Sequence, residues 1–91
     1  MKLYYLGKAK IVGYGSMMIP DTVLDEEQLD PKALFKTRKE AEELAEACEL
    51  TIASNLTPYE PYCAYDIWDI FEVDSNKLIP NYKNGFYELV R

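Results

Sequence analysis

The 91-residue sequence contains no histidine. Histidine is the usual general base near neutral pH and the commonest metal ligand, so its absence removes the familiar catalytic dyads and metal centres. The two cysteines, Cys48 and Cys63, do not have the spacing of a four-ligand zinc site. The Gly-x-Gly at residues 13–15 lacks the third glycine and the lysine-serine pair of phosphate-binding loops. We therefore predict a protein that is not an enzyme and has no metal or cofactor.

Long hydrophobic runs are absent as well. Every apolar run falls far short of the roughly 20 residues that a membrane-spanning helix needs. Gly7, Lys8 and Lys10 interrupt the N-terminal segment in which a signal peptide would be hydrophobic. The two cysteines have no CxxC spacing, and we expect both to be free thiols, with Cys48 on the apolar face of a helix. These features predict a cytoplasmic protein that does not associate with membranes.

The residues that are present indicate a folded domain. Hydrophobic residues make up 48% of the chain, which argues against disorder. The length suits one modest core, so we expect a single domain over residues 1–91. Residues 2–12 alternate as a strand, in which Gly7 indicates a bulge or a close backbone approach. Residues 17–24 predict a second strand that Pro20 confines to an edge, and residues 25–35 a loop with one helical turn at Pro31.

One helix is predicted clearly. Thr37 and Glu40 have the T-x-x-E spacing of a capping box, which satisfies amide donors at a helix start. The apolar residues that follow at helical spacing are Ala41, Leu44, Ala45, Cys48 and Ile52. We expect the helix to end near Asn55, since asparagine tolerates a left-handed cap.

The remaining third of the chain predicts strands. Residues 64–74 are rich in aromatic and β-branched residues, and residues 75–77 form a turn. Two further short strands flank Asn84-Gly85, which is a common hairpin signal. The order is β-β-α-β-β-β, and we predict a two-layer α+β fold with one main helix packed on a mainly antiparallel sheet.

Positive charge is missing from a long central stretch. Ten acidic residues and not one Lys or Arg lie between Glu40 and Asn76, whereas both ends of the chain are basic. Four glutamates form a ridge on the predicted helix: Glu42, Glu43, Glu46 and Glu49. Like charges at this spacing repel by a few tenths of a kcal/mol per pair. The ridge is either an ordinary solvated face or a surface that attracts a basic partner protein.

An aromatic segment follows the helix. Tyr59, Tyr62 and Tyr65 recur every third residue between prolines that favour an extended backbone, and Trp68 comes next. The rings either pack along the seam between helix and sheet or present a stiff contact surface to a partner. Asp69 shares a strand face with apolar residues, where a carboxylate either blunts an edge strand or serves as an acid-base group. The alternative is that Trp68 and Ile70 mark the core face and Asp69 lies in water.

We therefore hypothesise a small acidic protein that binds and inhibits or regulates a larger protein, which would be basic and nucleic-acid-handling. Its contacts would be the four helix glutamates with Tyr59, Tyr62, Tyr65 and Trp68. By analogy of composition, it would be an immunity, anti-defence or accessory protein of a phage or mobile element. The alternative is a module that binds a planar or nucleotide-like ligand in a pocket with Lys8 or Lys10 and several of the aromatic residues Tyr5, Tyr14, Tyr59, Tyr62 and Trp68. Direct nucleic-acid binding is disfavoured in an acidic chain, and an unpaired sheet edge would allow a homodimer.

Overall fold

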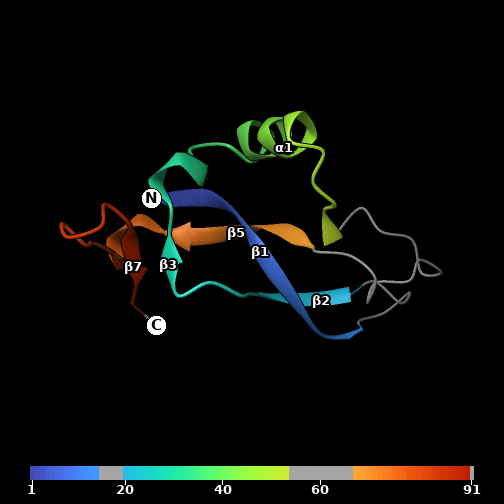
Figure 1. Cartoon of the computed structure of the whole chain (residues 1–91), viewed down its shortest axis with the longest axis horizontal. Coiled ribbons are helices and arrows are strands. Elements are labelled where there is room, and N and C mark those ends of the chain that lie inside the picture. Colours follow the sequence, from blue (N-terminus) through green and yellow to red (C-terminus); the bar gives the residue numbers. More distant parts are fainter. Residues whose placement is uncertain (15–19, 54–66, 91) are drawn as a thin grey trace.

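The computed structural model describes residues 1–14, 20–53 and 67–90 (Figure 1). Before the helix α1 (Arg38–Ala47), the strands are β1 (Lys2–Tyr14), β2 (Pro20–Leu24), β3 (Gln28–Leu29) and β4 (Leu34–Phe35). After the helix, the strands are β5 (Trp68–Asp74), β6 (Leu78–Pro80) and β7 (Tyr87–Leu89). The α+β class and the predicted order are confirmed, and β3 and β4 are two short additions beside the 3₁₀ turn that begins at Pro31.

The long strand β1 organises the main sheet. Residues 2–8 pair antiparallel with β5, residues 9–14 with β2, and Tyr4 and Tyr5 with β4. The register with β2 shifts between Ile11 and Gly13, so the second half of β1 contains a bulge. A second, three-stranded antiparallel sheet has the order β3-β7-β6. It lies at one end of the molecule in Figure 1.

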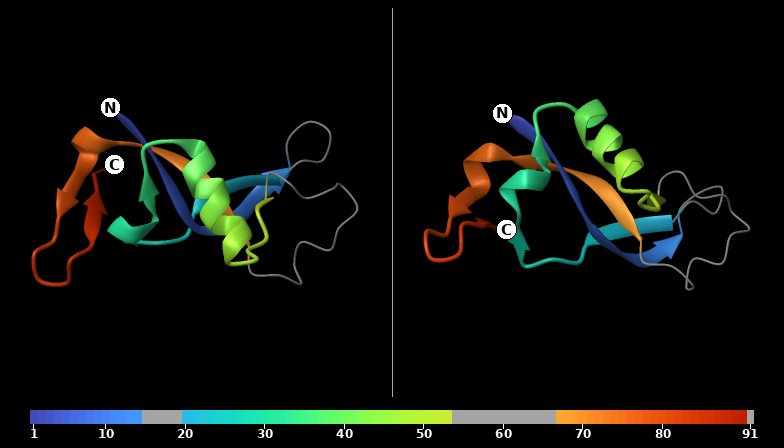
Figure 2. Two further views of the ribbon diagram at one scale, coloured as in Figure 1. Left: turned by 90° about the horizontal axis from the view of Figure 1, so that it is seen from above. Right: turned by 45° about the horizontal axis from the view of Figure 1, so that its top comes forward.

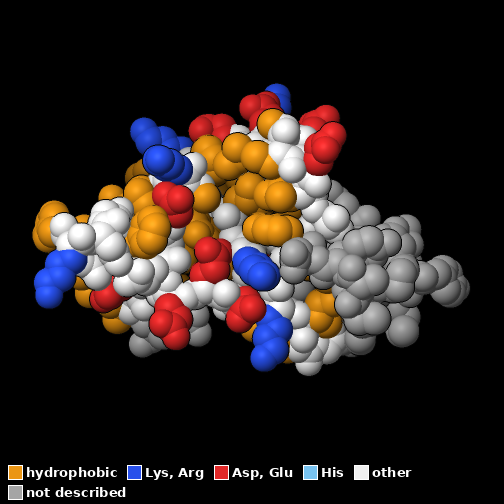
Figure 3. Space-filling model, viewed as in Figure 1, with side chains coloured by type: hydrophobic (Ala, Val, Ile, Leu, Met, Phe, Trp, Pro, Cys, Tyr) orange, Lys and Arg blue, Asp and Glu red, His pale blue; other side chains and the backbone are white. Residues whose placement is uncertain are grey.

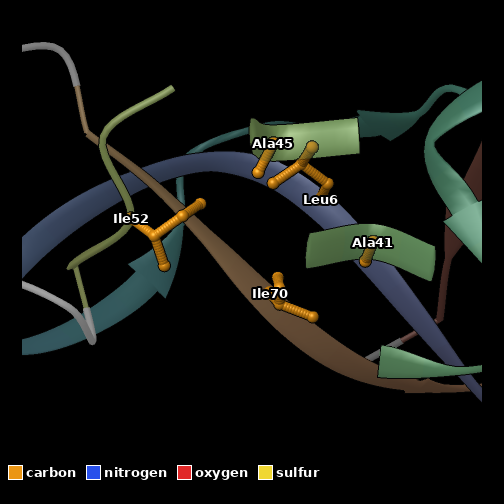
Figure 4. Close-up of a cluster of buried hydrophobic side chains, with 5 residues drawn as sticks. All are labelled: Leu6, Ala41, Ala45, Ile52 and Ile70. Carbon is orange, nitrogen blue, oxygen red and sulfur yellow. The ribbon is translucent and has the colours of Figure 1, made fainter. Parts of the chain in front are cut away.

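The helix covers one face of β1 and β5. Figure 2 shows α1 lying over these strands when the molecule is viewed from above. Buried Ala41 and Ala45 meet Leu6 of β1 and Ile70 of β5, and Ile52 closes the cluster (Figure 4). The small alanine side chains allow the helix backbone to approach the sheet closely, while the glutamates between them face solvent.

A second core lies on the opposite face of the same two strands. Tyr5 of β1, Val73 of β5 and Leu29 of β3 are buried together, and Leu78, Tyr87 and Leu89 of the second sheet pack against them. Alternation along β1 therefore sends Leu6 toward the helix and Tyr5 toward the small sheet. Both faces of the strand pair are covered, which explains why β5 is apolar on both sides.

Gly7 lies where side chains from other parts of the fold approach the backbone of β1 closely. A β-carbon at this position would lie 2.6 Å from the ring of Tyr5 and 2.7 Å from the carboxylate of Glu26, and would also collide with Leu24. The Glu26 carboxylate accepts hydrogen bonds from the Tyr5 hydroxyl (3.2 Å) and the Lys8 amide (2.8 Å). The predicted close approach at Gly7 is confirmed.

The helix end differs from the prediction. It begins after Thr37 as expected, since the Thr37 hydroxyl accepts from the Glu40 amide at 3.3 Å. It ends at Ala47, well before Asn55, because Glu49 takes a left-handed conformation (φ 55°) and turns the chain. Cys48 is therefore an exposed free thiol at the helix end, and its expected place on the apolar face was wrong. Ile52 is not helical, although it packs in the same core.

The C-terminal hairpin is confirmed. Strands β6 and β7 pair antiparallel, with Pro80 opposite Tyr87. The connection spans residues 81–86, and Gly85 has a left-handed backbone (φ 77°). The side chains of Asn81 and Asn84 accept hydrogen bonds from the amides of Lys83 and Phe86 and thus hold the loop in shape.

Candidate functional site

The candidate site lies on the exposed side of α1. Buried Ala41 and Ala45 fix which side of the helix faces the sheet, and this leaves Glu42, Glu43 and Glu46 exposed. Figure 3 shows carboxylates gathered over the helix at the top of this face. The prediction of a solvent-facing acidic helix surface is therefore confirmed, whereas its role as a binding surface remains a prediction.

Few cations accompany these glutamates. Arg38 Nε lies 3.3 Å from Glu42 Oε1, one helical turn away, and both side chains are about half exposed. In the described part of the chain, Glu43, Glu46 and Glu49 have no ion pair. An exposed pair of this kind contributes only about 0.3–0.5 kcal/mol. The surface thus keeps most of its negative charge.

Glu49 closes the helix in a Schellman motif. The Leu50 amide donates to the Ala45 carbonyl (2.9 Å) and the Glu49 amide to the Glu46 carbonyl (3.1 Å). Glycine is the usual residue at the left-handed position of this motif, because any β-carbon is strained there. The glutamate also places negative charge at the negative end of the helix dipole. Glu49 thus lowers stability on two counts.

A hollow lies beside the acidic surface. It has a volume of about 450 Å³ and is lined by Glu42 and Glu46 together with Ala45, Leu50 and Ile52. The chain reaches this position because it leaves the helix at Glu49 and runs next to the start of β5. There the Trp68 amide donates to the Thr51 carbonyl at 2.9 Å. Two glutamates and three apolar residues thus line one hollow that the helix ending creates, a feature that the pattern of charges did not reveal.

The aromatic half of the predicted site is only partly described. Tyr59, Tyr62 and Tyr65 lie outside the described residues. Trp68 is half-buried and packs against the cluster under α1, so its ring contributes to the core at the helix-sheet seam. Its strand partner is Lys8, which places both residues on the helix side of the sheet.

Among the described residues, one combination of the ligand-binding alternative is excluded, namely a pocket that contains both Tyr5 and Trp68. Tyr5 is 1% exposed and belongs to the core on the opposite face from Trp68, so the two rings cannot line one pocket. Burial raises the pKa of the Tyr5 hydroxyl to about 12, and the nearby Glu26 carboxylate adds to the effect against the opposing hydrogen bond from the Asp30 amide. The sequence pattern offered the ring of Tyr5 as a ligand contact. In the structure this ring is part of the core.

Asp69 is half-buried and hydrogen-bonded through both carboxylate oxygens. The Thr22 hydroxyl donates to Oδ2 at 2.8 Å, and the Ile70 amide donates to Oδ1 at 2.9 Å. The bond from Thr22 links β2 to β5, and the bond from Ile70 lies within β5, so the carboxylate has a structural role.

The described residues contain no group of three or more His, Cys, Asp and Glu side chains arranged to hold a metal ion. Within the same ranges, no helix has both the length and the apolar character needed to cross a membrane.

Comparisons of the chain with models of protein families, with curated proteins and with solved structures found no match.

Proposed function

We propose that this protein is a non-enzymatic binding module that docks on a basic surface of a larger protein and thereby inhibits or regulates it. The observation that carries the proposal is the exposed row of helix glutamates, of which one has an ion pair in the described part of the chain. A negative surface of this kind raises the rate at which a basic partner associates. Proteins that handle nucleic acids have basic surfaces and are the class of partner that this charge suits.

The hollow beside α1 adds a second reason. Its apolar lining of Leu50 and Ile52 would accept the aliphatic part of a lysine or arginine side chain, and Glu42 and Glu46, which line the same hollow, would contact the charged end. Charge alone would attract many basic proteins, whereas a shaped hollow beside the charge would favour one of them.

The destabilising effect of Glu49 supports the same proposal. A glutamate in a left-handed conformation at the negative end of a helix lowers stability, and destabilising residues persist most readily where they serve binding. Its carboxylate extends the acidic surface to the end of the helix.

The test is affinity capture from a lysate of the native host, with bound proteins identified by mass spectrometry. Wild type is compared with a variant carrying Glu42→Lys and Glu46→Lys. The matched control carries Asp21→Lys and Asp25→Lys, which change the net charge by the same amount. Asp21 is an exposed residue of β2, and Asp25 is the exposed residue that follows this strand. We expect a stoichiometric partner with the wild type and the control, lost in the helix variant and weakened by salt.

Two outcomes would count against the proposal. Retention of the partner by the helix variant would show that α1 is not the contact surface. Equal loss in both variants would show that net charge, rather than a site, controls the association. A small molecule bound in native mass spectrometry, without a protein partner, would favour the ligand-binding alternative.

A further inference from the structure

Strand β5 directs the backbone groups of its even-numbered residues away from β1. At the two ends of this strand pair, the Ser75 amide donates to the Met1 carbonyl and the Ala9 amide donates to the Ile67 carbonyl. Because antiparallel pairing alternates, the odd-numbered residues of β5 bond to β1 and the even-numbered residues face the outer edge. Glu72 is one of these even-numbered residues, and it is exposed.

One part of the outer edge is already paired. Ile52 forms a parallel bridge with Trp68, and the Trp68 amide donates to the Thr51 carbonyl at 2.9 Å. The Ile70 amide donates to the side chain of the residue before it. Among the described residues, neither the amide nor the carbonyl of Glu72 has a hydrogen-bond partner. Free backbone groups on a strand edge are a template for an added strand, which is a common mode of peptide recognition.

A pocket of about 410 Å³ lies beside Glu72 and Asp74. Its apolar lining consists of Val73, Leu89 and Val90, and two lysines line it as well. Val73 and Leu89 belong to the second core, on the opposite side of β5 from α1. In a strand added along Glu72, successive side chains would alternate between the helix side and this pocket.

The helix side of this edge is acidic. Ile52 lines the hollow beside α1 and also pairs on the outer edge, so the hollow and the edge are neighbours. The carboxylates that border them are Glu42, Glu46, Glu72 and Asp74. Lys2 pairs with Glu72 and Arg38 pairs with Glu42, which leaves Glu46 and Asp74 without an ion pair in the described part of the chain.

This charge identifies the kind of strand that fits. Pairing with β5 of a second copy would set Glu72 and Asp74 against the same carboxylates of the other chain, and like charges opposite each other destabilise a sheet. Lysine or arginine on the helix side of an added strand would instead meet carboxylates without ion pairs.

We infer that β5 accepts, as an added strand, an extended segment of the partner in which basic and apolar residues alternate. The basic side chains face the carboxylates on the helix side, and the apolar side chains enter the pocket beside Leu89 and Val90. This inference rests on the proposed function for the basic character of the partner, and it adds the form of the segment that binds.

The test is a nuclear magnetic resonance titration of the full chain with a heptapeptide of alternating lysine and valine, blocked at both ends. The control peptide has the same composition with its lysines and valines in two separate blocks, so only the alternating peptide can present one basic and one apolar side. We expect the alternating peptide to slow hydrogen exchange of the Glu72 amide and the block peptide to leave it unchanged.

Glu72→Pro and Glu72→Ala form the matched pair of variants. Both remove the same carboxylate, but only proline removes the amide hydrogen. Because that amide faces the outer edge, proline leaves the pairing with β1 in place. We expect Glu72→Pro to bind the alternating peptide about tenfold or more weakly than Glu72→Ala, through loss of one hydrogen bond at the edge. Thermal unfolding by circular dichroism reports whether each variant is folded, and exchange of the wild-type Glu72 amide decides the question if the proline variant is not.

Three results would overturn the inference: no protection of the Glu72 amide by the alternating peptide, equal protection by the block peptide, or equal binding by folded proline and alanine variants. Binding that is lost in Glu42→Lys with Glu46→Lys but kept in Glu72→Pro would show that α1 alone holds the peptide, which overturns the added strand and leaves the proposed function standing. Protection of Glu72 together with a failed capture experiment would have the reverse meaning.

Discussion

Replacing Glu49 with glycine should stabilise this protein. Glu49 is the one non-glycine residue with a positive φ among the described residues, and it closes α1. Glycine adopts this conformation without strain, and the two hydrogen bonds of the Schellman motif come from backbone groups that the substitution leaves in place.

The size of the gain follows from three contributions. A left-handed backbone costs a residue with a β-carbon roughly 1–2 kcal/mol. The greater conformational entropy of glycine in the unfolded chain offsets roughly 0.5–1 kcal/mol of this gain in stability. Removal of a negative charge from the C-terminal end of the helix adds about 0.3–1 kcal/mol. The expected net stabilisation is about 1 kcal/mol, which corresponds to an increase in Tm of about 4–8 °C for a domain of this size.

Thermal unfolding of Glu49→Gly and Glu49→Gln separates the contributions. The glutamine variant removes the charge and keeps the strained backbone, so it should gain only the electrostatic part, and this part should fade in high salt. The glycine variant should keep most of its gain in salt. A lower Tm for Glu49→Gly, or an equal gain for both variants, would refute backbone strain as the cause. If the acidic surface binds a partner, the stabilised Glu49→Gly variant should also bind it more weakly.

Three further predictions concern stability. Gly7→Ala should lower the free energy of unfolding by about 1–3 kcal/mol in chemical denaturation, because the added β-carbon has no room. Gly13→Ala is the control and should be nearly neutral in the same assay, since nothing lies within 4 Å of a β-carbon there. Tyr5→Phe should destabilise the protein at neutral pH. Because folding raises the pKa of Tyr5 to about 12, the wild type holds this proton more tightly when folded. Its advantage over Tyr5→Phe should be complete below pH 10 and shrink by about 2–3 kcal/mol between pH 10 and 12, as measured by urea titrations across that range. Thr37→Ala should cost about 1 kcal/mol through loss of the helix cap, with a matching decrease in Tm.

Features that depend on a few neighbouring residues could be predicted from the sequence. The start of α1 follows from the Thr37 hydroxyl and the Glu40 amide, which lie within one turn. The final hairpin follows from Asn84-Gly85, since glycine supplies the left-handed backbone that the loop needs. The exposure of the helix glutamates follows from the helical period and the two alanines opposite them. Each of these signals acts through bonds or sterics over a few residues.

Only the tertiary structure decided where α1 ends and what the sheet residues contact. The apolar spacing allowed the helix to continue past Ile52, but the Thr51 carbonyl bonds the Trp68 amide and draws the chain beside β5 instead. The sequence alone allowed Tyr5 to line a pocket, but in the folded chain Leu29 and Val73 enclose its ring. The exposure of Ile79 likewise depends on which side of β6 and β7 meets the second core. In each case the deciding contact comes from residues distant in the sequence, so it exists only once the chain has folded.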